Sequence, residues 1–304
     1  MSSTTIEVAP ALQASSLPRR RWRGGLQRSE FAWAVAFVIP YVAVFLAFVA
    51  YPVAYGLWMG HDPDLYHELL DDPIYVRTVV NTVIYLGIGV NLKMFGALLL
   101  SGFFMRRSWW TKGLLLIYVL PWAVPALPTF LSIHWMLNGQ WGLINNTLWD
   151  LFHIDGPGWL ETSRWLALGS VIASHIWKWM PFWTVILLAG RMAIPQEVYD
   201  AAAIDGATGF QRFFYVTLPL LGSLYLICTL LSTVFTLGDF NSVYFVSGGG
   251  PALSTHVLAT LGIRDAFQIA RPDLGVATVM SALPLMIPLI ILLMRKLRTT
   301  DIQL

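Results

Sequence analysis

Long apolar segments alternate with short polar ones along most of the chain. Six of them are long enough to cross a bilayer, whose hydrocarbon core needs about 20 helical residues. They are residues 31–59, 78–104, 114–137, 165–190, 216–238 and 274–294. The apolar runs are continuous rather than alternating, which favours transmembrane helices over the strands of a membrane barrel. The pattern therefore predicts an all-α polytopic membrane protein with six spans.

The composition agrees with a membrane location. Hydrophobic residues make up 57% of the 304 positions and charged residues 12%, and the mean hydropathy is +0.64. Soluble domains carry about 25% charged residues, so a soluble fold would lack charge for its surface. The net charge of +2 gives no basis for nucleic-acid binding. The single cysteine, Cys228, lies in an apolar run, so we expect it to be a packing residue.

The distribution of basic residues predicts the topology. Arginine and lysine gather in the N-terminal tail, after the second and fourth spans, and at the C-terminus. Such an excess marks cytoplasmic segments, so we expect a multi-pass protein of the cell (inner or plasma) membrane with both termini inside. We expect a cytoplasmic tail over residues 1–30, a transmembrane domain over 31–298 and a short cytoplasmic tail over 299–304. The tail lacks the apolar core of a cleavable signal peptide.

Prolines interrupt several of the predicted spans. The third contains Pro121, Pro125 and Pro128. Proline removes a backbone hydrogen bond, which a membrane helix tolerates only where neighbouring groups or water bind the freed carbonyl. The prolines therefore favour bent helices around a pathway, although proline is also common in ordinary membrane helices.

The loop over residues 195–219 contains the pattern of a short helix. Pro195 suits the first turn of a helix, and Glu197 lies where the helix dipole favours an anion. An alanine-rich segment follows, and Gly206 can end the helix. The residues alone allow two interpretations: an interfacial link between two spans, or a compact knob that enters a groove on another protein.

The spacing in this loop resembles a known signature. Asp200-Ala201-Ala202 is followed after three residues by Gly206, and after nine more by Val216, Thr217, Leu218 and Pro219. This resembles the EAA signature of binding-protein-dependent ABC importer permeases, with Asp for Glu at 200 and Val for Ile at 216. Further segments resemble the carbohydrate subfamily: residues 81–82, 120–125, 138–145, 247–251 and 254–255. The extended outer loop at 136–164 resembles the first permease of a maltose, trehalose or glycerol-phosphate importer.

The resemblance implies a mechanism and a set of partners. It implies a type I ABC importer permease fold that moves a sugar inward by alternating access, beside a second, homologous permease subunit. A dimer of cytoplasmic ATPase subunits would drive the movement, and an extracytoplasmic solute-binding protein would deliver the cargo. The implied ATPase-coupling residues are Glu197, Asp200, Ala201, Ala202, Asp205, Gly206, Ala207, Leu218 and Pro219.

The chain itself shows no sign of catalysis. It has no phosphate-binding G-x-x-x-x-G-K-[ST] loop, so ATP and Mg²⁺ are expected on the ATPase partners, with no cofactor in this chain. Its six histidines show no metal-ligand spacing such as H-E-x-x-H. We therefore expect a permease that is not an enzyme and holds no metal. A membrane-embedded enzyme would need a cluster of catalytic groups that the sequence does not show.

Polar residues within the spans are candidates for the substrate pathway. We select Asn91, Trp177, Lys178, Asp239, Asn241 and Tyr244. Lys178 is expected to line the passage, to pair with a carboxylate such as Asp239, or to be structural. Lys93 is expected to extend its amine to the cytoplasmic interface. Mixed amide, hydroxyl and aromatic groups suit a sugar, but the residues do not distinguish a di- or oligosaccharide from a sugar or glycerol phosphate.

A second class of function remains open from the residues alone. A self-contained secondary transporter or channel for a small polar solute would also be a polytopic helical protein. Such transporters are commonly built from internal repeats with discontinuous helices. Residues 31–137 and 165–294 show no convincing repeat, which favours the permease subunit.

Overall fold

A computed structural model of the chain describes residues 28–106 and 108–301, and every regular element among them is helical. The described chain divides into two compact parts, one up to residue 54 and one from residue 55 onward. Most of the expected tail over residues 1–30 lies outside the described residues. The all-α prediction is confirmed over the part of the chain that the structure describes.

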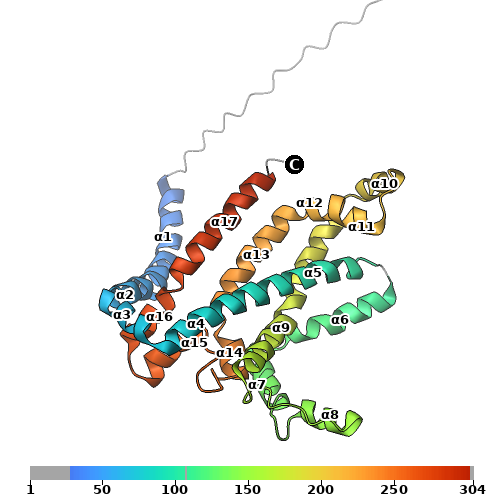
Figure 1. The fold of residues 1–304 in the computed structure, drawn as a ribbon. Helices are drawn as coiled ribbons and strands as arrows, with labels where there is room; N and C mark the ends of the chain where they lie inside the picture. The colour runs from blue at the N-terminus through green and yellow to red at the C-terminus, as the bar shows by residue number, and fades with distance from the viewer. Residues whose placement is uncertain (1–27, 107, 302–304) are drawn as a thin grey trace, which may run out of the picture. The chain divides into compact units, whose positions relative to one another are not determined.

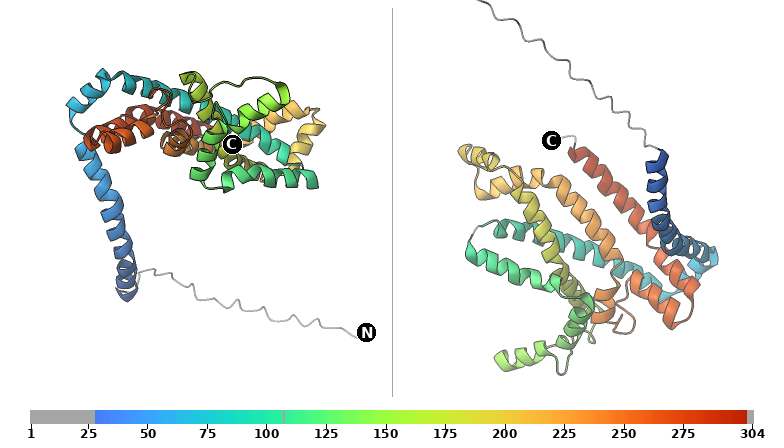
Figure 2. Two further views of the ribbon diagram at one scale, coloured as in Figure 1. Left: turned by 90° about the horizontal axis from the view of Figure 1, so that it is seen from below. Right: turned by 180° about the vertical axis from the view of Figure 1, so that it is seen from behind.

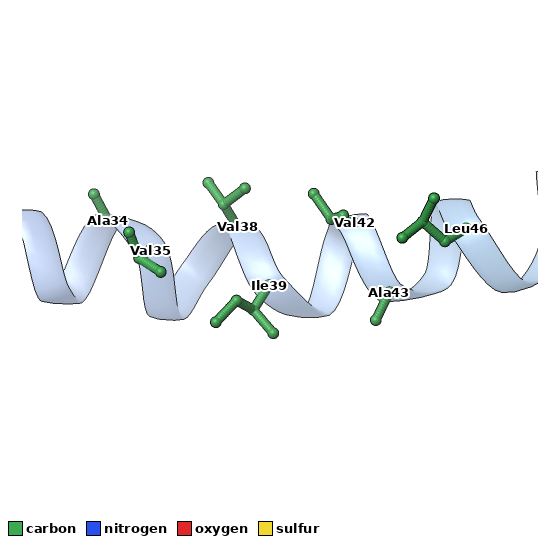
Figure 3. Close-up of a pocket in the computed structure, with 7 residues that line it drawn as sticks. All are labelled: Ala34, Val35, Val38, Ile39, Val42, Ala43 and Leu46. Carbon is green, nitrogen blue, oxygen red and sulfur yellow. The ribbon is translucent and has the colours of Figure 1, made fainter. Parts of the chain in front are cut away.

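The first part is one long apolar helix. It consists of α1 (Arg28–Phe45), the wider π-helical turn η1 (Leu46–Ala50) and the start of α2 (Tyr51–Met59). Most of its side chains are exposed, and Figure 3 shows seven of them along α1 and the start of η1, all aliphatic. A long helix whose exposed side chains are mostly apolar suits contact with lipid.

The second part contains the remaining helices, shown in Figure 1. Its first half consists of α3 (Pro63–Asp71), α4 (Pro73–Ile84), η2 (Tyr85–Val90), α5 (Asn91–Phe104), α6 (Trp109–Ala123), α7 (Ala126–Met136) and α8 (Leu143–Phe152). Its second half consists of α9 (Arg164–Met192), α10 (Gln196–Ile204), α11 (Gly209–Arg212), η3 (Phe213–Thr217), α12 (Leu218–Leu220), α13 (Gly222–Leu237), α14 (Phe240–Val246), α15 (Leu258–Ile263), η4 (Arg264–Gln268), α16 (Pro272–Met280) and α17 (Leu283–Asp301).

The candidate spans agree in position with the sequence pattern. Four helical segments are long and apolar enough to cross a membrane: Trp33–Met59, Pro73–Phe104, Arg164–Met192 and Pro272–Lys296. Two further segments are bent, by 95° between α6 and α7 and by 69° between α12 and α13. The number of spans is six if each bent pair crosses once. The second predicted span, which starts with α4, begins at Pro73 and so earlier than predicted. Asp72 caps this helix, and Pro73 occupies its first turn.

The last helix extends into the expected C-terminal tail. Helix α17 continues to Asp301, although residues 299–304 were expected to form a tail. The apolar pattern ends before the helix does, because the polar residues that follow are compatible with a helix outside the bilayer.

Three packed clusters hold the second part together. Met94, Ala97 and Leu187 are fully buried where α5 packs along α9, and Cys228 belongs to the same cluster, which confirms its predicted packing role. A second cluster joins α7, α9 and α14 around Phe130. A third joins α3, α4, α15 and α16. Figure 2 shows α8 at the end of this part opposite to α10, in agreement with Figure 1. The packing brings α5, α6, α9 and α13 around one cavity.

Candidate functional site

One face of α9 lines a cavity of about 490 Å³ in the second part. His175, Trp179 and Phe182 lie four and three residues apart, a spacing that places side chains on the same face of a helix. Helices α5, α6, α13 and α14 supply the rest of the wall. The lining residues are Lys93, Trp122, His175, Trp179, Phe182, Trp183, Val234, Phe235, Thr236, Gly238, Asp239 and Asn241.

A buried polar network forms one side of this cavity. The Nζ of Lys93 lies 2.9 Å from Nε2 of His175 and donates to Oγ1 of Thr236 at 3.0 Å. Nδ1 of His175 lies 2.7 Å from Oδ2 of Asp239. Since Nε2 accepts from the lysine, the network assigns the imidazole proton to Nδ1, from where it donates to the carboxylate. One imidazole therefore connects a cation on α5 to an anion at the end of α13.

Asp239 is the centre of this network. Its Oδ2 also accepts from the hydroxyl of Tyr85 at 2.8 Å and from the hydroxyl of Ser242, and its Oδ1 accepts from the backbone N–H of Ser242 at 3.2 Å. The last contact caps α14. A buried carboxylate is stable only when it is paired and hydrogen-bonded. The network therefore joins the second, fourth and fifth spans.

The expectation for Lys93 is wrong. Its side chain is only 1% exposed and does not reach an interface. The acceptors on His175 and Thr236 hold the amine inside the helix bundle. They offset the cost of removing the charge from water, so the amine need not extend to the interface.

Lys178 stabilises the bend between α6 and α7. Its Nζ donates to the carbonyl of Pro121 at 2.6 Å and also to that of Val124. In a regular helix these carbonyls would accept from the N–H groups four residues later, but those positions are Pro125 and Pro128, which have none. The lysine replaces both missing donors. Of the alternatives left open for Lys178, the structure favours the structural one, and Lys178 does not pair with Asp239.

We expect Lys178→Met to destabilise the bend, because it leaves both carbonyls unpaired in an apolar environment. The expected loss is about 2 kcal/mol of unfolding free energy, typical for hydrogen bonds from a charged donor. Thermal stability of the detergent-solubilised chain measures it. Lys112→Met, at an exposed lysine near the start of α6, is the matched control. Equal stability of the two variants would show that Lys178 does not hold the bend.

The structure brings only part of the predicted substrate pathway to the cavity. Asp239 and Asn241 line it. Asn91 instead donates to the carbonyl of Gly87 at 2.6 Å. Trp177 is 49% exposed on the opposite side of α9, and Tyr244 stacks on Phe240. The sequence reasoning missed Lys93, His175, Trp122 and Trp179 as lining residues. Of these, His175 and Trp179 could have been recognised from their helical spacing on α9.

A second polar cluster holds the loop that follows α14. The side-chain amide of Asn81 donates to the carbonyls of Ser254 and His256, both at 2.8 Å, and its oxygen accepts from Arg164 at 2.7 Å. Burial lowers the pKa of His256 to about 4, so its imidazole is neutral. At Gly249, φ is +83° and a Cβ would lie 2.2 Å from that imidazole. The Asn-Thr pair at 81–82 and the glycines at 248–250 therefore position one loop.

The loop over residues 195–219 contains an exposed helix. Helix α10 has no buried residue and lies at the end of the second part opposite to α8 (Figure 1). The backbone N–H of Ala207 donates to the carbonyl of Ala202 at 2.9 Å, and that of Gly206 to the carbonyl of Ala203 at 3.1 Å. This pair of bonds with a left-handed glycine is a Schellman motif. Gly206 has a φ of +80°, which confirms that it ends the helix.

The predicted coupling residues share this exposed region. Glu197, Asp200, Ala201 and Asp205 are exposed, as are Gly206 and Pro219, whereas Ala202, Ala207 and Leu218 are half-buried. The hydroxyls of Tyr199 and Thr217 lie 3.2 Å apart and tie α10 to η3. Ile204 and Phe210 are 87% and 76% exposed. A short helix with a Schellman end and a tie to η3, with apolar side chains beside it, presents an ordered surface for a partner.

These features define a class of protein. The protein is a helical membrane protein with a polar and aromatic cavity between its spans. An exposed short helix lies at one end of these spans, an arrangement that suits a transport subunit. The chain belongs to the family described as binding-protein-dependent transport system inner membrane component, whose profile matches residues 94–298. It is therefore a membrane permease subunit of an ABC transporter.

Curated relatives resemble the chain over most of its length. It is 30% identical to the sulfoquinovosyl glycerol transport system permease protein SmoG of Agrobacterium fabrum, over 92% of this chain and 95% of the relative. It is also 30% identical to the trehalose/maltose transport system permease protein MalF of Thermococcus litoralis, over 75% of this chain and 81% of the relative. These matches confirm the family resemblance that the sequence motifs indicated.

The fold has a counterpart among solved structures. A chain in the crystal structure of a bacterial ABC transporter involved in the import of the acidic polysaccharide alginate superposes with a TM-score of 0.76. The match has 22% sequence identity and covers 89% of this chain and 96% of that chain. The architecture is therefore that of an ABC importer permease.

Proposed function

We propose that this chain is the first of two homologous permease subunits in an ATP-driven sugar importer. The exposed helix α10 carries the proposal, because its Schellman end and its tie to η3 make it stiff enough to transmit force. A dimer of cytoplasmic ATPase subunits would bind α10, with ATP and Mg²⁺ on those subunits and no cofactor in this chain. An extracytoplasmic solute-binding protein would deliver the sugar. The end bearing α10, and both termini, would be cytoplasmic.

The 490 Å³ cavity is this chain's proposed contribution to the sugar pathway. Its indole rings can stack on a sugar ring, and Asn241 offers amide hydrogen bonds. The one lysine in the lining, Lys93, is already bound to His175 and Thr236, and Asp239 balances its charge. The lysine that suggested an anionic cargo, Lys178, binds two carbonyls instead. The cavity therefore favours an uncharged di- or oligosaccharide over a sugar phosphate.

Cargo-stimulated ATPase activity tests the proposal. The chain is reconstituted with its partner subunits and binding protein, and the assay is run with neutral disaccharides and with sugar phosphates. We expect a neutral sugar to stimulate hydrolysis and Trp179→Ala to reduce that stimulation several-fold, with unstimulated hydrolysis unchanged. Transport by this chain alone, driven by an ion gradient without ATP, would instead establish the self-contained transporter.

A further inference from the structure

A second cavity lies where α5 and α9 end, beside the segment that follows α10. Its volume is about 550 Å³. The charged side chains that line it are three arginines, Arg106, Arg191 and Arg212, and no carboxylate of the described residues joins them. It shares no lining residue with the 490 Å³ cavity. We call it the arginine cavity.

Arg191 is fixed in the wall of the arginine cavity. It is only 7% exposed, its Nη2 donates to the carbonyl of Leu98 at 2.9 Å, and its guanidinium lies 5.4 Å from the ring centre of Phe213. Helix α5 comes close at Gly102, where a Cβ would lie 2.7 Å from Nη1. The guanidinium is thus held on several sides, and its buried Nε–H makes no hydrogen bond.

Arg212, on α11, also has a buried Nε without a partner. It lies at the end of that helix and is half-buried. A buried charged donor that makes no hydrogen bond is costly, so two such donors in one cavity call for an acceptor. Arg106 adds a third, exposed charge. The ligand that fits is an anion with several acceptor oxygens.

We propose that the arginine cavity binds a phosphate group. The guanidinium fork matches the geometry of phosphate oxygens, and both arginines with an unpaired Nε line this cavity. The group could come from the head of an anionic phospholipid or from a soluble phosphate compound. In either case it would join the ends of α5 and α9 to α11, the element that follows the coupling helix. The ligand would thereby stiffen the connection between the spans and α10.

Binding to the full chain, purified with its partner subunits in nanodiscs, tests this proposal. One arm titrates inorganic phosphate into phosphatidylcholine nanodiscs and measures the shift of the melting temperature. The other arm uses native mass spectrometry to compare retention of phosphatidylglycerol with that of phosphatidylcholine. We expect a shift in the first arm if the source is soluble, or selective retention in the second if it is a lipid. Absence of both overturns the proposal.

The variants separate this cavity from general surface charge. We expect Arg212→Gln to weaken binding about tenfold, which corresponds to about 1.4 kcal/mol, and Arg212→Lys to restore part of it. Arg295→Gln, at an exposed arginine outside the cavity, should leave binding unchanged. Arg191→Gln is a second test, and its melting temperature without ligand checks its folding. Equal binding by wild type and Arg212→Gln overturns the proposal.

One result would reassign the arginines. If Arg212→Gln releases the ATPase subunits from the complex without changing phosphate or lipid binding, the arginines serve that interface and the phosphate proposal fails. These outcomes are independent of the sugar, because no step of the assay requires cargo. Failure here therefore leaves the proposed transport function intact.

Discussion

Gly206→Val is expected to abolish transport while leaving the chain folded in the membrane. The glycine ends α10 with a φ of +80°, and a Cβ there would meet nothing within 4 Å. Steric overlap with neighbours therefore plays no part, and the effect comes from the backbone. A left-handed conformation costs an L-residue about 1–2 kcal/mol, and β-branched residues tolerate it least. Valine would shift the chain out of the Schellman motif and change the direction in which α10 points.

The matched control for this prediction is Gly206→Asn. Asparagine also adds a Cβ at the same open position, but it enters the left-handed region far more readily than valine. We expect cargo-stimulated ATPase activity to fall at least about tenfold in Gly206→Val and to be largely retained in Gly206→Asn. Membrane levels measured by immunoblot should be equal. Equal loss of activity in both variants would show that the side chain, and not the backbone, is what the partner detects.

Local features of the fold could be predicted because they depend on local sequence. Six apolar segments of sufficient length are visible in the sequence, and the helix and turn at 195–219 follow from Pro195, the alanines and Gly206. The family motif depends only on spacing, and the family that it indicated was confirmed. The bend at Pro125 could be expected as well, since proline removes a backbone donor.

The roles of the buried charges could not be predicted from one sequence. Lys93 and Lys178 both occur within apolar segments, and the residues next to each in the sequence do not determine which helices pack around it. The contact between Lys93 and His175 joins positions 82 residues apart, and that between Lys178 and Pro121 joins positions 57 apart. The sequence therefore left the role of Lys178 open and did not place Lys93 at the cavity. The freed carbonyls before Pro125 and Pro128 were the one local signal that a donor was needed nearby.

The buried network around Asp239 leads to the second large effect. Lys93→Met should leave the carboxylate with less compensation, and Asp239→Asn should leave the ammonium without its anion. Removing one partner of a buried charge pair typically costs about 3–5 kcal/mol, because the remaining charge stays buried. Asparagine retains the acceptor that caps α14, so the loss would report the charge of the carboxylate and the hydrogen bonds at its Oδ2, and not the cap. Each single variant should therefore show a clearly lower melting temperature in detergent.

The double variant Lys93→Met with Asp239→Asn should recover much of this loss. It removes both charges together, so no uncompensated charge remains in the bundle, and the two effects should be non-additive by at least about 1 kcal/mol. The comparison is the same cycle at Glu68 and Arg271, an ion pair at 3.0 Å whose side chains are 52% and 39% exposed. That pair is outside the bundle and screened by water, so its coupling should lie below about 1 kcal/mol. Additive losses at Lys93 and Asp239 would contradict charge compensation through His175. Strong coupling there and weak coupling at the exposed pair would show that burial makes the network essential to the packing of the second, fourth and fifth spans.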